Sequence, residues 1–529
     1  IESYQAATKF DAQAAAAWLR LGVISGRGNN AQAESAFNEA ARLYQSLGNS
    51  EGVTEVLYQH AGWLMNRKSL IEARAELEKA LVATKSLTNH YQQIKILLLL
   101  GYVSDLESKQ AEAEQEVAEA IHLAQDEKME SLTARGLISL GSLFFSNNKY
   151  TEAEKYYQQA LSFAQQYRSG YKTALAQINL GSLHIQQTRL EEGLREIEQA
   201  LAFFRAGNYQ QDTAQALVLL GRAQRKKGDY RAAQQTYEEQ LAVAKQSGDK
   251  TLEAQTHSEL SLLYEYQDLY PAALHEIDQS YQLNQTLGRK SKLGYNLISR
   301  ANALWQLGRL AETRQALNQA SEITAQLNQG DRQLIALIFL TEASLGLCER
   351  NFLLAIAKSK EALANAATFP DIAVRAKSVQ GLAQTQSGKS LAGISLCEQA
   401  VHEAEQQGDA RLVAAASLNL AQAKAIRKLG FTGGTALHAQ KLFQQLNQPE
   451  SEWRASLLVA LAEQASGERT RVQTAFQAAE AALKRLPQLW GREAFEHYLS
   501  RPDIQQLHRQ WLTLSVASGQ SQPQINKER

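Results

Sequence analysis

At 529 residues the chain exceeds the ~250–300 residues at which a single compact core stops growing, so we expect several domains or one extended repeat array. Its 55 Lys plus Arg balance its 55 Asp plus Glu, and this zero net charge disfavours a nucleic-acid partner, because such proteins usually carry a basic excess. The two cysteines, Cys348 and Cys397, exclude a disulfide framework and a four-thiolate zinc site, and we expect both to be small core residues.

The start of the chain reads as part of a longer helical protein. Residues 1–13 begin with Ile1 and show the pattern of the last helix of a truncated upstream repeat.

The composition favours an all-α fold. The first of only six prolines is Pro271, and the Ala, Leu, Gln and Glu that dominate are strong helix formers. No stretch approaches the ~20 apolar residues that span a bilayer. We expect no membrane insertion by this chain, and a cytoplasmic location, or the far side of a membrane if a spanning segment precedes it.

The segment from Leu132 to Ala164 predicts a helical hairpin. Each half carries one apolar stripe at helical spacing, and polar residues 147–149 separate the halves. Gly141 and Ala153 are small where a facing stripe is usually large, so the two helices are expected to approach closely beside Tyr157. Such a hairpin cannot bury both of its faces alone.

This hairpin recurs at an interval of 40 residues along the chain. The Leu-Gly pair of its first helix has counterparts at Leu21-Gly22, Ala61-Gly62, Leu100-Gly101, Leu180-Gly181, Leu220-Gly221, Leu260-Ser261, Arg300-Ala301, Leu340-Thr341, Gln380-Gly381, Leu420-Ala421 and Leu461-Ala462. The small and large positions of the second helix keep the same phase. We therefore expect about twelve copies between residues 14 and 485.

The repeated positions resemble the tetratricopeptide repeat. The residues that carry the resemblance are Trp18, Leu21 and Gly22 in one copy, and Leu140, Gly141, Ala153, Tyr157 and Ala160 in another. The resemblance implies an all-α, right-handed superhelical solenoid whose first helices line the concave side. The period is longer than the usual ~34 residues. Glycines such as Gly48, Gly248 and Gly288 replace the usual proline between repeats and are expected to form left-handed caps.

The end of the chain departs from the repeat. The run Lys428–Thr435 lengthens one interhelical turn. Residues 486–518 are predicted to be capping helices, in which Trp490, Phe495, Tyr498 and Trp511 cover the last exposed hairpin. Residues 519–529 are predicted to be a disordered tail.

No catalytic constellation, cofactor site or metal site stands out against the repeats, so we predict that this chain is not an enzyme. His402 and Glu403 lack the second histidine of a zinc-protease helix. The glycines of Lys428–Thr435 lack the Gly-Lys-Ser/Thr of a P-loop, and an interhelical turn explains them better.

The resemblance implies groove positions six and three residues before the Leu-Gly glycine and one, four and five residues after it. The candidate peptide groove contains Trp63, Asn66, Arg67, Tyr102, Asp105, Arg135, Phe145, Arg222, Arg225, Lys226, Glu265, Tyr266, Tyr295 and Trp305. Aromatic rings supply contact area and guanidinium groups hold carboxylates, so this mixture suits a protein or peptide ligand. The alternative is that the same residues pack against one another.

Three functions remain open for a non-catalytic protein-binding module. The 40-residue array is similar to the C-terminal repeat region of bacterial eukaryotic-like serine/threonine protein kinases, which implies a sensor or scaffold next to a kinase domain. No kinase motif occurs in this chain. The second function is the sensor arm of a transcription regulator or nucleotide-dependent switch, and the third is a free-standing scaffold.

Overall fold

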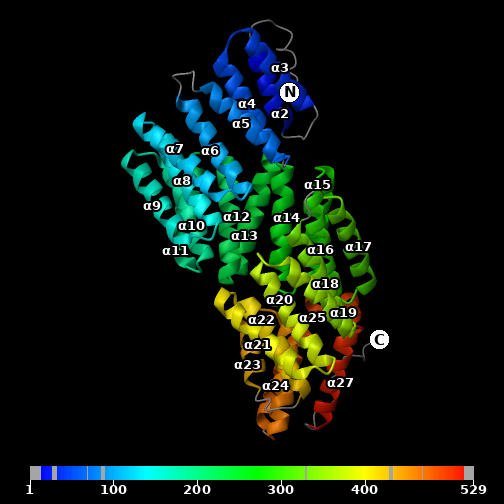
Figure 1. Ribbon diagram of the computed structural model, residues 1–529. Coiled ribbons are helices and arrows are strands. Elements are labelled where there is room, and N and C mark those ends of the chain that lie inside the picture. Colours follow the sequence, from blue (N-terminus) through cyan, green and yellow to red (C-terminus); the bar gives the residue numbers. More distant parts are fainter. Residues whose placement is uncertain are drawn as a thin grey trace. The chain divides into compact units, whose positions relative to one another are not determined.

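The computed structural model describes residues 14–26, 32–67, 69–84, 90–327, 331–427, 433–467 and 469–517. The predicted lone helix at 1–13, the predicted tail at 519–529 and most of the glycine-rich turn, residues 428–432, lie outside these ranges. Within the ranges every regular element is a helix and no strand occurs, which confirms the all-α prediction (Figure 1).

The helices follow one another without interruption by any other element. In the first half they are α2 (Ala14–Gly26), α3 (Gln32–Ser46), α4 (Ser50–Asn66), α5 (Leu70–Thr84), α6 (His90–Leu106), α7 (Gln110–Asp126), α8 (Glu130–Ser146), α9 (Tyr150–Gln166), α10 (Gly170–Gln186), α11 (Leu190–Ala206), α12 (Gln210–Lys227) and α13 (Tyr230–Ser247). In the second half they are α14 (Lys250–Glu265), α15 (Tyr270–Thr286), α16 (Lys290–Gln306), α17 (Leu310–Ala325), α18 (Arg332–Cys348), α19 (Phe352–Asn365), α20 (Pro370–Gln386), α21 (Ser390–Gln407), α22 (Ala410–Arg427), α23 (Gly434–Gln445), α24 (Pro449–Ser466), α25 (Arg469–Trp490), α26 (Arg492–Leu499) and α27 (Pro502–Ala517).

The helix starts confirm the 40-residue period. Helices α4, α6, α8 and α10 begin at residues 50, 90, 130 and 170, and the second helix of each pair begins twenty residues later. Within each unit described below, helices pack against the next in the chain and against the first helix of the next pair. The described residues thus contain a helical repeat solenoid, with twelve successive pairs from α2–α3 to α24–α25.

The hairpin α8–α9 shows why the small residues recur. A Cβ on Gly141 would lie 2.6 Å from Cδ1 of Tyr157, so only glycine permits this helix separation. The Tyr157 ring is buried, and its hydroxyl donates a 3.1 Å hydrogen bond to Ser142 Oγ. The predicted close approach is confirmed.

Most of the described turns between helices contain one residue with positive φ. Gly48, Gly248 and Gly288 have φ of 64°, 68° and 66°, which confirms the predicted glycine caps. Several other turns place an L residue there at a cost of about 1–2 kcal/mol each. These are Ser108, Lys128, Asn148, Arg168, Thr188, Asn208, Asp268, Arg350 and Asn447.

The chain divides into two compact units, which we call unit 1 (Ile1–Ala223) and unit 2 (Gln224–Arg529). In the described part of unit 1, the apolar clusters join neighbouring helix pairs. In unit 2, the largest cluster joins α15 and α16 to α22–α27, so the C-terminal helices pack back on much earlier repeats.

Four aromatic residues at the end of unit 2 are buried in this cluster: Trp490, Phe495, Tyr498 and Trp511. Trp490 Nε1 donates a hydrogen bond to the backbone oxygen of Asp268, in the α14–α15 turn. Tyr498 receives a 2.8 Å hydrogen bond from Trp453 Nε1 and donates a 3.0 Å bond to Glu450 Oε1. These rings therefore contact repeats well before the last hairpin; their role as an end cap stays a prediction.

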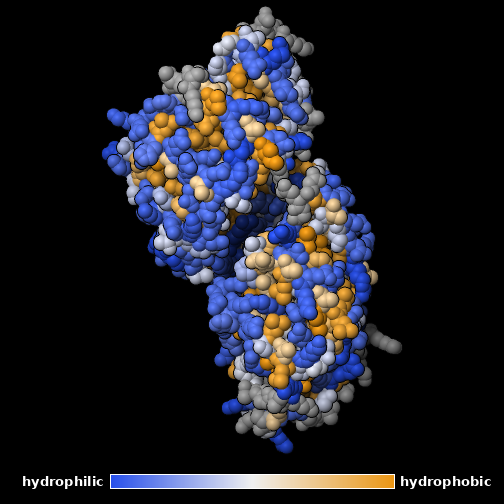
Figure 2. All heavy atoms as spheres, in the orientation of Figure 1, coloured by the Kyte–Doolittle hydropathy of each residue, from blue (hydrophilic) through white to orange (hydrophobic). Residues whose placement is uncertain are grey.

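The surface mixes polar and apolar residues over both units (Figure 2). The most exposed large apolar side chains are Ile71, Leu353 and Leu391, at 80%, 78% and 68%, and each lies on the second helix of its pair. Cys348 and Cys397 are buried, as expected for core residues, and burial raises the pKa of each thiol to about 12. In the described part of the chain, no helix has the length and apolarity that a membrane crossing requires.

Candidate functional site

Trp63, the first predicted groove residue, lies in the core of unit 1. Only 6% of it is exposed, and its ring lies 5.5 Å from the His60 ring and 6.1 Å from the Phe37 ring. Arg67 covers it, with the guanidinium carbon 4.8 Å from the ring centroid. The Trp63 ring is thus occupied by intramolecular packing.

The other predicted groove residues of unit 1 are mostly exposed and do not form one cluster. Asn66, Arg67, Tyr102, Arg135 and Arg222 are exposed, Tyr102 by 52%. The two remaining residues join neighbouring repeats or helices: Asp105 accepts hydrogen bonds from Ser146 and Asn147 of the next repeat, and Phe145 packs on Tyr150 at 5.8 Å.

Two predicted groove residues of unit 2 are held by other side chains. The Tyr295 hydroxyl donates to Asp331 Oδ1 at 3.0 Å and to Gln333 Oε1 at 3.2 Å, and burial together with Asp331 raises its pKa. The Trp305 ring is covered by the Arg501 guanidinium at 4.9 Å. Both rings are half-buried.

Three predicted residues of unit 2 do come together, with two residues that the prediction missed. Arg225 and Arg411 both lie on the Tyr266 ring, at 4.6 and 3.6 Å from its centroid. Arg375 is close enough to Tyr266 and Arg411 for their charges to act on it, and burial together with Arg411 lowers its pKa. We call Arg225, Arg375 and Arg411 the arginine cluster.

Glu265 is the carboxylate beside the arginine cluster. Its Oε1 is buried and has no hydrogen-bond partner among the described residues. Burial raises its pKa to about 7, although Arg411, Arg375 and Arg225 oppose that shift. Lys226, the last predicted residue, is exposed; partial burial of its ammonium lowers its pKa, and Asp409 acts against this shift.

A cavity of about 680 Å³ lies within unit 2, lined mainly by α16, α18, α20, α22, α24 and α27. Its apolar wall includes Leu347, Leu382, Leu418, Phe443 and Leu458. Arg375 lines the cavity and belongs to the arginine cluster, so the two features adjoin. Trp305 lines it as well.

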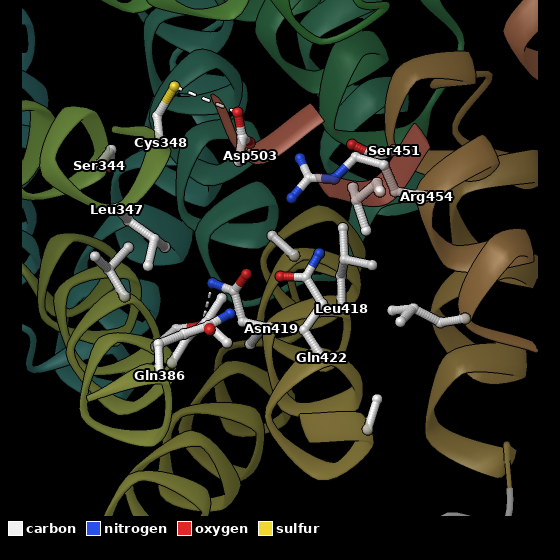
Figure 3. Close-up of a pocket in the computed structure, with 18 of the residues that line it drawn as sticks. Ser344, Leu347, Cys348, Gln386, Leu418, Asn419, Gln422, Ser451, Arg454 and Asp503 are labelled. Atoms are coloured by element: carbon white, nitrogen blue, oxygen red, sulfur yellow. Dashed lines mark hydrogen bonds between the residues drawn. The ribbon is translucent and has the colours of Figure 1, made fainter. Parts of the chain in front are cut away.

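Polar side chains reach this cavity from several helices. Figure 3 shows Asn419 and Gln422 pointing into it from α22, Gln386 from α20, and Arg454 from the opposite wall on α24. Asn419 Nδ2 donates a 2.9 Å hydrogen bond to Ser378 Oγ. Arg454 lies 3.3 Å from Glu450, and its Nε is buried without a partner among the described residues. The cavity thus combines apolar contact area with unused donors and acceptors.

Among the described residues, no group of three or more His, Cys, Asp or Glu side chains could hold a metal ion. The amides and guanidiniums of the cavity can bind polar groups of a ligand through directional hydrogen bonds.

Four of the cavity residues that the sequence analysis missed occupy groove positions of the repeat. Arg375 stands six residues before Gly381, Ser378 three before it and Gln386 five after it, and Gln422 follows Ala421 directly. Extending the groove positions past Trp305 would have found all four. Arg411 and Arg454 follow no such spacing, and no signal in the sequence marks them.

Two family models, both described as tetratricopeptide repeat, match residues 132–206 and 216–251. A search of curated proteins found no match.

Several solved structures are similar to the chain, all with TM-scores below 0.5. The apo form of RapI is 13% identical with a TM-score of 0.43, over 62% of this chain and 91% of that one. A signal-transduction ATPase with a tetratricopeptide repeat sensor, from Pyrococcus horikoshii, is 13% identical with a TM-score of 0.47, over 67% of this chain and 53% of that one. A Rap protein complexed with competence and sporulation factor is 17% identical with a TM-score of 0.42, over 56% and 82%. Together with the helix pairs, the family-model matches show tetratricopeptide repeats at residues 132–206 and 216–251 of this chain.

Proposed function

We propose that this chain is the sensor or scaffold module of a larger signalling protein, and that it binds an extended peptide in the cavity of unit 2. The observation that carries the proposal is the cavity itself. Its volume of about 680 Å³ falls within the ~300–1,000 Å³ typical of ligand sites, and its wall is apolar with a few convergent polar groups.

The side-chain amides of the cavity favour a peptide over other ligands. Each carboxamide offers both donors and an acceptor, which matches the N–H and C=O of a peptide backbone. Besides Asn419, the amides that line the cavity are Gln306, Gln386, Gln422, Gln464, Gln506 and Gln510. The side-chain amides of Gln386 and Gln422 make no hydrogen bond within the described residues, so a peptide need not displace an existing partner.

The proposal also concerns the type of domain to which this module is attached. A serine/threonine protein kinase of the bacterial eukaryotic-like type is the candidate that the resemblance of the repeat region supports. A transcription regulator, a nucleotide-dependent switch or a free-standing scaffold are the alternatives. The gene sequence around this chain distinguishes them, because kinase motifs, a winged-helix motif or neither will be present.

Peptide retention by cavity variants tests the proposal. The chain would be immobilised and exposed to a pool of fluorescent random peptides, and the retained fraction measured. Leu382→Trp fills the cavity and should reduce retention about tenfold or more. Leu391→Trp replaces a residue of α21 that is 68% exposed and should leave retention unchanged. Equal retention by wild type and Leu382→Trp would refute the cavity as the binding site.

A further inference from the structure

We infer that the arginine cluster at the edge of the cavity is a subsite for an oxyanion carried by the peptide, either a carboxylate or a phosphate. This inference rests on the proposed peptide binding and names the chemical group that the peptide must present.

The three arginines reach one place from three helices. Arg225 comes from the end of α12, Arg375 from α20 and Arg411 from α22, and Tyr266 lies between Arg225 and Arg411. A ring can hold two guanidiniums in place through cation–π contacts without neutralising their charge. The aromatic ring therefore positions the cations and leaves their donors available.

Four carboxylates act electrostatically on this cluster, but those of Glu265, Asp371 and Asp409 form no ion pair with its guanidiniums within the described part of the chain. Arg225 forms an ion pair with Glu259 at 3.7 Å and interacts with Tyr237, whereas its Nε is buried without a hydrogen-bond partner among the described residues. Asp409 is used as the N-cap of α22, where it accepts from the backbone N–H groups of Arg411 and Leu412. The guanidiniums of Arg375 and Arg411 form no ion pair or hydrogen bond within the described part of the chain.

The Glu265 carboxylate does not form a hydrogen-bonded ion pair with the arginine cluster. Its Oε1 is buried without a hydrogen-bond partner, although all three arginines act on it electrostatically. A native ion pair would place this oxygen on a guanidinium, because an unpaired buried charge is costly. The arrangement instead leaves room for an external oxyanion that accepts from the arginines.

The geometry of guanidinium groups selects the ligand class. Planar guanidiniums bind carboxylates and phosphates through paired N–H···O hydrogen bonds. Because Arg375 also lines the cavity, a peptide lying along the amides would bring its terminal carboxylate, an acidic side chain or a phosphorylated residue to the cluster.

The experiment uses three matched random-peptide pools on the immobilised chain. One pool has free C-terminal carboxylates, the second is amidated and lacks Asp and Glu, and the third is the second with one phosphoserine added. We expect the first or third pool to be retained about tenfold or more above the second, and the pool that wins identifies the source of the oxyanion.

Variants assign that preference to the cluster. Arg375→Gln and Arg411→Gln should each abolish the preference, whereas Arg231→Gln removes an exposed arginine of unit 2 and should preserve it. Circular dichroism melting confirms that each variant is folded, and Arg411→Lys, which keeps the charge, should restore part of the preference.

Two results would overturn the inference, and only the second would also overturn the proposed peptide binding. If all three pools are retained equally, and Leu382→Trp still reduces that retention, peptide binding stands and the oxyanion subsite is refuted. If wild type retains no pool, the proposed peptide binding fails, and the subsite fails with it.

Discussion

Units 1 and 2 use the same repeat but differ in what lies against their first helices. In unit 1 the predicted groove residues Tyr102 and Arg135 are exposed, and each helix pair packs on its neighbours. In unit 2 the helices α24–α27 return to earlier repeats, cover Trp305 with Arg501 and help to enclose a cavity. Because the repeat pattern is shared, the cavity of unit 2 depends on the packing of α24 and of the C-terminal helix α27 against earlier repeats.

The largest expected effect comes from breaking this return contact. Arg501 has no exposed side-chain surface, pairs with Asp503 at 2.7 Å and donates to the Gln306 backbone oxygen at 3.0 Å. Arg501→Ala removes a fully buried guanidinium, leaves the half-buried Asp503 without its ion-pair partner and should lower the free energy of unfolding of unit 2 by about 3 kcal/mol. Hydrogen exchange under increasing urea would measure each unit separately.

The control for Arg501 is Arg492→Ala, which removes a side chain that is 75% exposed and paired with Glu496. It should change stability by less than about 1 kcal/mol. Faster exchange throughout unit 1 in Arg501→Ala would contradict the view that the return contact stabilises unit 2 alone.

A smaller effect is expected from a change in the regular packing of unit 1. Gly141→Leu places side-chain atoms against the buried Tyr157 ring and should destabilise the α8–α9 hairpin by about 1–3 kcal/mol. Gly62→Ala is the control, because a Cβ there meets no atom within 4 Å and a helical Gly→Ala change gains up to ~1 kcal/mol. Chemical denaturation of both variants would check the contrast, and similar losses would contradict it.

The pH dependence of stability should also distinguish the units. Asp268 in unit 2 is buried beside Glu450, and burial followed by Glu450 raises its pKa from 3.8 to about 7. The folded state then binds a proton that the unfolded state has released, so this contribution is complete below about pH 4 and lost as the pH rises to about 7. The slope from this group is at most about 1.4 kcal/mol per pH unit.

Glu450→Gln tests that assignment without removing the backbone N–H that donates to Asp268 at 3.0 Å. Removing the Glu450 charge should lower the pKa of Asp268 and shift the loss of stability to lower pH. Urea unfolding of unit 2 between pH 5 and 8 is the measurement, and a profile unchanged by the substitution would exclude Asp268 as the titrating group.

The smallest effect concerns the turns. Thr188 has a φ of 64°, which is strained for a β-branched residue, so Thr188→Gly should stabilise unit 1 by up to about 1 kcal/mol. The reverse change at the equivalent turn of unit 2, Gly388→Ala, where φ is 95°, should destabilise it by a similar amount. Thermal melting would show opposite shifts, and shifts of one sign would contradict the strain argument.

The sequence predicted the repeat architecture because that architecture depends on local, periodic features. Gly141 faces Tyr157 within one hairpin, and Gly48 lies in the turn that directly follows a helix. Both features involve residues close in sequence, so the repeated pattern alone indicates them. The cavity was only partly predictable. Arg375 and Gln386 occupy regular groove positions, so the repeat pattern could have predicted them. Arg501 contacts Trp305, which lies nearly 200 residues earlier, and a periodic pattern carries no information about so distant a contact.

Hydrogen exchange of the whole chain, with and without the best-retained peptide, tests the central claim most directly. If unit 2 binds the peptide in its cavity, amide protection should increase in α20, α22, α24 and α27, and the exchange of α4–α10 should stay unchanged. Protection confined to the exposed groove residues of unit 1 would contradict the account.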